Sequence, residues 1–281
     1  MLPKILSSQR RARRLGALLH YLVLVLVALF CAFPMLWTLS TAIGTEGNVF
    51  AFPPSLIPSA PSWVNFAEVF KVIDLGRYYW NSIWITFWTV VWTVVVCALA
   101  AYPLARLKFK GRQLVFSIIL VTLMLPTEVN FLVNFITMSK LGLVNTHLGV
   151  ILPTIAGAIG IFMLKSAFEE VPQDLIDAAR VDGASELRIF WQIMLPLALP
   201  QIATLIIFTT VTSWNNFLWP GVVLTKSELM PLAVGILELS GTFGSATRVI
   251  AAGAVLTIAP ALLVFFFTQR FFMRGLDGAV K

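Results

Sequence analysis

Long apolar runs separated by short polar segments dominate this chain. Six runs reach the length of about 20 residues that a transmembrane helix needs, and they are Leu15–Leu39, Tyr79–Leu104, Leu114–Phe135, His147–Phe168, Leu195–Leu218 and Val249–Phe272. The first run is expected to be bent or strained at Pro34, and Pro126-Thr127-Glu128 interrupts the third. The pattern predicts an all-α polytopic membrane protein with six transmembrane helices.

The composition supports a membrane protein and argues against several other classes. Hydrophobic residues make up 59% of the 281 residues and charged residues only 12%, whereas a soluble domain carries about 25% charged residues. Once the apolar runs are removed, no water-facing basic domain remains that could bind nucleic acid. Cys31 and Cys97 both lie in apolar runs, which indicates packed helices rather than a disulfide framework.

Basic residues set the predicted orientation. With six spans, 15 of the 20 Lys and Arg residues fall on the side of both termini, and the positive-inside rule makes that side cytoplasmic. The expected organisation is a cytoplasmic tail over 1–14, a membrane domain over 15–272 and a cytoplasmic tail over 273–281. The predicted location is the inner membrane of a prokaryote.

The external segment 44–78 has two halves. Its first half, FAFPPSLIPSAP, is rich in proline, which fixes φ and favours extended chain. Its second half places Trp63, Phe66, Phe70 and Ile73 at helical intervals. This spacing predicts a short amphipathic helix, lying either on the outer membrane face or against the helical bundle.

The segment between the fourth and fifth runs carries eight charged residues from Glu169 to Arg188. Each would cost about 2.5–3.5 kcal/mol at the bilayer centre, so this segment, 165–194, is expected in water on the cytoplasmic side. Pro172 suits a first helical turn, Gly183 suits a helix end and Ser185 suits a second N-cap. The segment therefore predicts two short helices that meet at a glycine corner.

The faces of these two helices indicate what the segment contacts. The first helix is expected to group Leu175, Ala178 and Ala179, and the second is expected to group its apolar residues Leu187, Phe190, Trp191 and Met194. Small residues allow a close approach, and the acids Asp177, Asp182 and Glu186 offer acceptors to a partner. Either the segment docks in a groove of another protein, or it folds back on its own bundle.

The spacing of Asp177-Ala178-Ala179, Gly183, Ile193 and Leu195-Pro196 resembles the EAA loop of ABC-importer permeases. In that family the loop forms a coupling helix that sits in a cleft of the ATP-binding subunit. The usual first residue is Glu, and Asp177 keeps its charge with one methylene less. The resemblance assigns coupling to Asp177, Ala178, Ala179, Asp182, Gly183, Ala184 and Glu186.

Further stretches resemble the carbohydrate-uptake, maltose-type branch of that family. They are AARVDGAS, FPPSLIPSAPSWVNF, LGLVNTHLGVILP, TSWNNFLWP and the ending GLDGAVK. The resemblance implies import of a sugar, oligosaccharide, polyol or glycerol ester. It implies four kinds of partner: membrane lipid, a second related permease, two ATP-binding subunits that hold ATP and Mg, and an external solute-binding protein.

The chain itself is expected to be non-catalytic and free of cofactors. It contains no GxxxxGK[ST] phosphate-binding loop, and it groups no Ser/His/Asp or metal-ligand set, which argues against a membrane enzyme. Two rival classes stay open. One is an ABC permease for a non-sugar solute, and the other is an ion-coupled secondary transporter, for which Glu128 is the candidate intramembrane carboxylate.

Polar side chains inside spans usually face the interior of a helical bundle. The candidates near the outer ends of the third and fifth spans are Glu128, Asn130, Asn134, Trp214, Asn215 and Asn216. They are interpreted either as part of the substrate path or outer gate, or as hydrogen-bonding contacts with the second permease.

Overall fold

The computed structural model describes residues 2–52, 56–58, 60–242, 247–260 and 262. The chain divides into two units, one of Met1–Val72 with Leu239–Leu256 and one of Ile73–Glu238 with Thr257–Lys281. Helices predominate in both, and the described ranges contain an isolated bridge between Gly44 and Pro61 but no strand. The predicted all-α class is confirmed.

The first unit contains α1 (Leu2–Ile43) and α2 (Val64–Val72). α1 is longer than predicted, because it takes in both the expected tail and the first apolar run, and it continues through Pro34. α2 is the predicted short helix. Asn65 holds it against the end of α1 by donating to the carbonyls of Ala42 and Gly44, both at 2.8 Å. On its other side Phe70 stays exposed.

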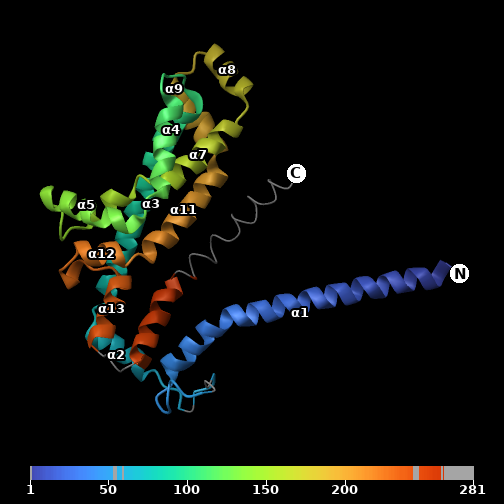
Figure 1. Ribbon diagram of the computed structural model, residues 1–281, viewed down its shortest axis with the longest axis vertical. Coiled ribbons are helices and arrows are strands. Elements are labelled where there is room, and N and C mark those ends of the chain that lie inside the picture. The colour runs from blue at the N-terminus through green and yellow to red at the C-terminus, as the bar shows by residue number, and fades with distance from the viewer. Residues whose placement is uncertain (1, 53–55, 59, 243–246, 261, 263–281) are drawn as a thin grey trace. The chain divides into compact units, whose positions relative to one another are not determined.

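The second unit is organised around α3 (Leu75–Arg106), which matches the second predicted span. Its first turn is capped by Asp74, whose Oδ1 accepts from the backbone N–H of Arg77 at 3.2 Å. α7 (Ala158–Glu170) and α11 (Leu199–Trp214) pack along α3 (Figure 1). A Cβ at Gly160 of α7 would lie 2.7 Å from the Cys97 sulfur of α3, so this glycine permits the close approach of the two helices.

Three of the predicted spans are broken pairs of helices, each bent by more than 40°. The sequence predicted an interruption in the third run and a bend or strain at Pro34 in the first. It predicted no break in the fourth and fifth runs, where the structure shows one. The segments in order are α4 (Arg112–Val121), η1 (Thr122–Met124), α5 (Thr127–Lys140), α6 (His147–Ile151), η2 (Leu152–Thr154), α7, η3 (Phe190–Met194), α10 (Leu195–Leu197) and α11. Prolines lie next to the breaks, where they remove backbone donors.

The remaining described helices complete the second half of the chain. They are α12 (Leu218–Val223), η4 (Ser227–Leu229), α13 (Leu232–Thr242) and an apolar helix over Thr247–Pro260. Within the described residues, two helices are long and apolar enough to cross a membrane, and up to five spans result if each bent pair counts as one. The sixth predicted run begins in Thr247–Pro260, and its later part lies outside the described residues.

Two clusters of buried side chains stabilise the second unit. One lies where α3, α7 and residues 190–198 meet. Its fully buried members include Leu164, Phe168, Ile176, Ile189 and Met194. The other surrounds Trp219, whose Nε1 donates to the carbonyl of Val150 at 3.2 Å. The first cluster anchors the charged segment that follows α7, because Ile176 and Ile189 belong to that segment.

Candidate functional site: a polar elbow and two cavities

The charged segment forms two short helices at one end of the bundle (Figure 1). α8 (Gln173–Val181) and α9 (Glu186–Ile189) meet at Gly183, whose φ of +79° favours glycine. The Ser185 hydroxyl accepts from the N–H of Arg188 at 3.3 Å and caps α9. The predicted pair of helices at a glycine corner is confirmed, and residues 171–194 are called the elbow below.

The inner face of α8 differs from the predicted one. Ile176 is fully buried and Ala179 packs against the same cluster, whereas Leu175 and Ala178 are exposed. Ala184 also packs inward. Val181, at the end of α8, is 88% exposed. The outer surface of the elbow therefore combines Ala178, Val181 and Gly183 with acidic side chains.

The second helix turns a different face inward because it continues into a π-helix. In η3 the backbone N–H of Leu195 donates to the carbonyl of Phe190, five residues earlier. A π-turn holds one residue more than an α-turn and shifts the register of the side chains. Phe190 and Met194 are buried, whereas Leu187 and Trp191 are 69% and 62% exposed, so the predicted single face of four residues is wrong.

Arg180 joins the two helices of the elbow. Its Nη1 lies 3.2 Å from Asp177 Oδ1 and its Nε lies 3.0 Å from Glu186 Oε1. The hydrogen bond with Glu186 raises the pKa of Arg180 above its ordinary value. Asp177 and Glu186 are therefore paired within the elbow, contrary to the expectation that both offer open acceptors. Asp182 is exposed, and its carboxylate has no partner among the described residues.

Two side chains at the end of α3 hold the elbow from the bundle. The Tyr102 hydroxyl donates to Glu186 Oε2 at 2.5 Å. One turn later, Arg106 Nε donates to the carbonyl of Phe168 at 2.8 Å, and Nη2 donates to the carbonyls of Phe168 and Val171. These carbonyls end α7 and have no partner within the helix itself. Tyr102 and Arg106 thus contact both sides of the elbow, and they are called the α3 clamp below.

Gln173 closes the network between the clamp and Arg180. It accepts from Arg106 Nη1 at 3.0 Å and donates to Asp177 Oδ1 at 3.0 Å. Tyr102 was not predicted as a functional residue, and Arg106 was counted only among the basic residues that orient the spans. A tyrosine and an arginine four residues apart at the basic end of a span were the available signal.

Replacing Tyr102 with phenylalanine tests the clamp with a minimal change. The variant loses one hydrogen bond to a charged group, and because Glu186 is partly exposed we expect a loss of about 1 kcal/mol in unfolding free energy. Thermal unfolding in detergent measures it. Tyr21→Phe in α1 is the control, because Tyr21 is exposed. Equal midpoints for the two variants would contradict a stabilising role of the Tyr102 hydroxyl.

Two cavities lie away from the elbow in the same unit. The amide cavity, of about 410 Å³, is lined by Asn130, Asn134 and Asn216 together with Thr154. The hydroxyl cavity, of about 300 Å³, also includes Thr154 and Asn216 in its lining. The shared residues make the two cavities neighbours.

The six predicted path residues separate into two groups. Asn130, Asn134 and Asn216 meet at the amide cavity. Trp214 Nε1 donates to the carbonyl of Thr257 at 3.3 Å, and Asn215 Nδ2 donates to the carbonyl of Val211 at 2.9 Å. Neither of these two residues lines either cavity. Glu128 belongs to α5, and its side chain lies outside the described residues.

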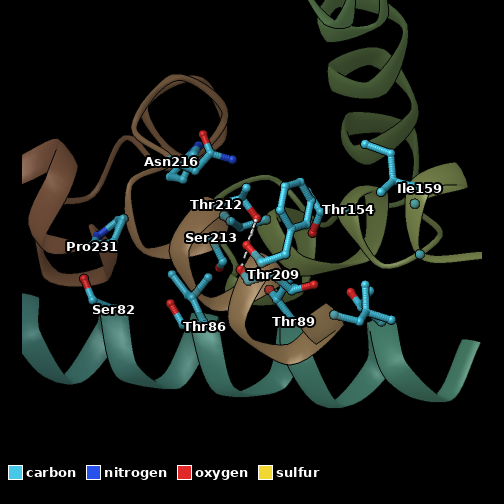
Figure 2. Close-up of a pocket in the computed structure, with 18 of the residues that line it drawn as sticks. Ser82, Thr86, Thr89, Thr154, Ile159, Thr209, Thr212, Ser213, Asn216 and Pro231 are labelled. Atoms are coloured by element: carbon cyan, nitrogen blue, oxygen red, sulfur yellow. Dashed lines mark hydrogen bonds between the residues drawn. The ribbon is translucent and has the colours of Figure 1, made fainter. Parts of the chain in front are cut away.

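The hydroxyl cavity was not predicted. One side of this cavity is lined by a row of four hydroxyl residues on one face of α3, and these are Ser82, Thr86, Thr89 and Thr93. Figure 2 shows Ser82, Thr86 and Thr89 on α3 facing Thr209, Thr212 and Ser213 of α11. The spacing of the row follows the helical period. This spacing was visible in the sequence but was obscured by the tryptophans between the threonines.

Apolar helices around polar cavities, with an ordered charged elbow at one end, define a subunit of a membrane transporter. The chain belongs to the family of binding-protein-dependent transport system inner membrane components, which matches residues 94–278.

Several relatives are similar over nearly the whole chain. The arabinooligosaccharides transport system permease protein AraQ of Halalkalibacterium halodurans is 37% identical, with 96% of this chain and 99% of the relative covered. The lactose transport system permease protein LacG of Rhizobium radiobacter is 32% identical, with 96% and 98% covered. The sn-glycerol-3-phosphate transport system permease protein UgpE of Yersinia pestis is 31% identical, with 93% and 96% covered.

The fold is also similar to solved transporters. A chain of a bacterial ABC transporter that imports the acidic polysaccharide alginate has a TM-score of 0.80 and 26% identity, with 93% of this chain and 98% of that chain covered. A chain of the alginate transporter in complex with its pentasaccharide-bound periplasmic protein has a TM-score of 0.67 and 16% identity, with 93% and 96% covered. The predicted ABC-permease fold is confirmed.

Proposed function

We propose that this chain is the permease subunit of an ATP-driven importer for a sugar, oligosaccharide, or related polyol or glycerol ester. The observation that carries the proposal is the elbow. It is exposed, ordered by a cap and an ion-pair network, and joined to α3 by Tyr102 and Arg106. Relatives named for arabinooligosaccharides, lactose and sn-glycerol 3-phosphate support the substrate range.

The proposed assembly has four kinds of protein. This permease pairs with a second, related permease, and two ATP-binding subunits that hold ATP and Mg dock on the pair from the cytoplasm. An external protein delivers the solute, a proposal supported by the similarity to a transporter solved with a periplasmic protein. We propose six spans with both termini in the cytoplasm, supported by the location of 15 of the 20 basic residues on one side.

The elbow is proposed to couple the ATPase mechanically to the hydroxyl cavity. A rigid element that follows a moving ATPase cleft carries this motion into the helices to which it is bonded. The elbow continues directly from α7 into α11, and the α3 clamp adds a third helix. These three helices also line the hydroxyl cavity. Movement of the elbow is therefore expected to change the walls of that cavity.

The outer surface of the elbow is suited to a protein partner. Val181 and Leu187 are exposed apolar side chains beside the small residues Ala178 and Gly183. Asp182 has an open carboxylate that can accept from an arginine or a backbone N–H of the ATPase. Of the acids that the sequence assigned to docking, Asp182 is proposed as the one that contacts the partner, while Asp177 and Glu186 keep the elbow rigid.

The solute path is proposed to pass the amide cavity. Asn130, Asn134 and Asn216 converge there from α5 and from the segment after α11, and amides both donate and accept hydrogen bonds. Asn215 and Trp214 are instead proposed to fix the end of α11 through their backbone contacts.

Purification of the tagged chain in mild detergent, followed by reconstitution in liposomes, tests the proposed function. We expect co-elution of a second permease and an ATPase, and solute uptake that requires ATP and the external protein. Uptake should persist when ionophores remove the proton and sodium gradients. Uptake that depends on an ion gradient and proceeds without ATP would contradict the proposal and support a secondary transporter.

A further inference from the structure

The hydroxyl cavity contains threonines that behave differently from the other helical threonines of this chain. A helical threonine commonly donates to the carbonyl four residues earlier. Five described threonines do so, and they are Thr38, Thr137, Thr204, Thr210 and Thr212. Within the described part of the chain, five hydroxyls that line the cavity make no hydrogen bond, and they belong to Thr86, Thr89, Thr93, Thr209 and Ser213.

Such hydroxyls require an explanation because the four threonines that carry them are nearly buried, while Ser213 is half-buried. Thr89 and Thr93 are each 4% exposed, and the Thr93 oxygen is buried without a partner. A buried hydroxyl without a hydrogen bond costs free energy, so nearly all buried polar groups are satisfied by protein, water or ligand. The Thr93 oxygen is closed off from solvent, whereas the hydroxyls of Thr86, Thr89, Thr209 and Ser213 are open to the cavity. Four open hydroxyls around one cavity therefore indicate hydrogen-bonding groups that enter it.

The charge of the lining restricts what those groups can be. None of the described residues that line this cavity is Asp, Glu, Lys, Arg or His. A phosphate or carboxylate ligand would lose its hydration there without a cation to pair with. Hydroxyl groups both donate and accept, and they match the hydroxyls of a neutral ligand.

The apolar part of the lining and the size of the cavity complete the description. Ile85, Leu123 and Phe208 lie among the hydroxyl residues, and they suit the C–H faces of a sugar ring. The volume of about 300 Å³ is at the lower end for small-molecule sites. We propose that the hydroxyl cavity binds one unit of a neutral, polyhydroxylated solute, by hydrogen bonds from Thr86, Thr89 and Thr209. This proposal rests on the proposed function as an importer.

The threonine row also offers the solute a path. Thr86 and Thr89 are three residues apart on α3, which is about 4.5 Å along the helix axis. The amide cavity adjoins the hydroxyl cavity at Thr154 and Asn216. A sugar unit can therefore exchange the amides for the first hydroxyls and then pass from one hydroxyl to the next without losing all of its hydrogen bonds.

The test uses valine substitutions in the complete importer, reconstituted with its second permease, ATPase and external protein. The variants are the double change Thr86→Val with Thr89→Val and the single change Thr209→Val. Valine matches the shape of threonine, and none of these hydroxyls bonds to the protein, so the helices lose no internal hydrogen bond. Thr210→Val is the matched control, because Thr210 is the next residue on α11 but bonds to Ile206 and does not line the cavity.

The probes are radiolabelled lactose and arabinotriose as neutral solutes, and sn-glycerol 3-phosphate and an alginate trisaccharide as anionic ones. We expect the wild type to take up a neutral probe. Each hydroxyl removed should lower this uptake about 2- to 12-fold. Thr210→Val should leave it unchanged. ATP hydrolysis stimulated by the external protein should remain in every variant, which separates loss of the solute site from loss of coupling.

Each of the other uptake results would contradict a different part of the proposal. Neutral uptake that is equal in all variants would overturn the binding site but leave the importer function intact. Uptake of anionic probes alone would overturn the neutral class of solute. Failure of the wild type to take up any probe would overturn the proposed carbohydrate function, and the inference with it.

Discussion

Replacing Gly183 with valine is expected to lower coupled transport strongly while the protein still inserts and folds. Gly183 has a φ of +79° at the corner of the elbow. A residue with a Cβ pays about 1–2 kcal/mol in this conformation, and a β-branched residue is especially unfavourable there. The corner would relax to another geometry, and α8 and α9 would no longer present one docking surface. Each 1.4 kcal/mol lowers the docking-competent population about tenfold, so a strain of about 1–2 kcal/mol corresponds to a loss of uptake of about 5- to 30-fold.

The measurement combines ATPase retention with uptake in the reconstituted importer. We expect the ATP-binding subunit to dissociate from the Gly183→Val complex in detergent. Gly142→Val is the matched control, because Gly142 also has a positive φ, of +68°, and open space around its Cβ, but lies in the turn after α5. Both variants carry similar backbone strain. If the Gly183 variant keeps its ATPase and its uptake, the elbow is not the coupling element.

Replacing Arg106 with alanine is expected to loosen the attachment of the elbow to α3. Arg106 donates to the carbonyls of Phe168 and Val171 and to Gln173. A hydrogen bond from a charged group contributes about 1.5–3 kcal/mol when it is shielded from water. Because the carbonyls that end α7 would lose their donor, we expect unfolding free energy to fall by about 2–4 kcal/mol. Uptake should fall more than ATP hydrolysis, since the elbow would still dock but would no longer move α3.

Arg112→Ala is the control for removal of a nearby positive charge. Arg112 makes one ion pair, with Glu169 at 3.6 Å, and both side chains are partly exposed. Such a pair contributes about 0–1 kcal/mol. Thermal unfolding and the ratio of uptake to ATP hydrolysis should therefore change little in this variant. A similar uptake-to-hydrolysis ratio in Arg106→Ala and wild type would show that the clamp has no part in coupling.

Local chemistry made the elbow predictable. Eight charges in a short segment cannot lie in a bilayer, and proline, glycine and serine at 172, 183 and 185 mark the ends of two helices through backbone effects that act within a few residues. The same kind of local signal predicted α2 and the break at Pro126. The family followed from the spacing of a few residues in and after the elbow.

Side-chain orientation in the elbow was not predictable in the same way. The π-turn at 190–194 is stabilised by the burial of Phe190 and Met194 among residues of α3 and α7, and helical periodicity alone cannot anticipate it. Asp177 and Glu186 had the charge expected of docking groups. They pair instead with Arg180: Asp177 is three residues away within α8, and the turn at Gly183 brings Glu186 of α9 to the same guanidinium.

The sequence by itself determined the class of this protein, its apolar helices, the polar elbow and the family, because hydropathy, charge and helix-end signals depend on near neighbours in the chain. Only the tertiary structure decided which acids stay free, that Tyr102 and Arg106 hold the elbow, and that the hydroxyl row of α3 faces α11 across a cavity. The acids pair with Arg180 only three and six positions away, where the corner of the elbow selects the pairs among local alternatives. The clamp joins residues 62 and 84 positions apart, and the hydroxyl cavity joins α3 to α11, and such contacts arise from the packing of helices, which no local pattern specifies.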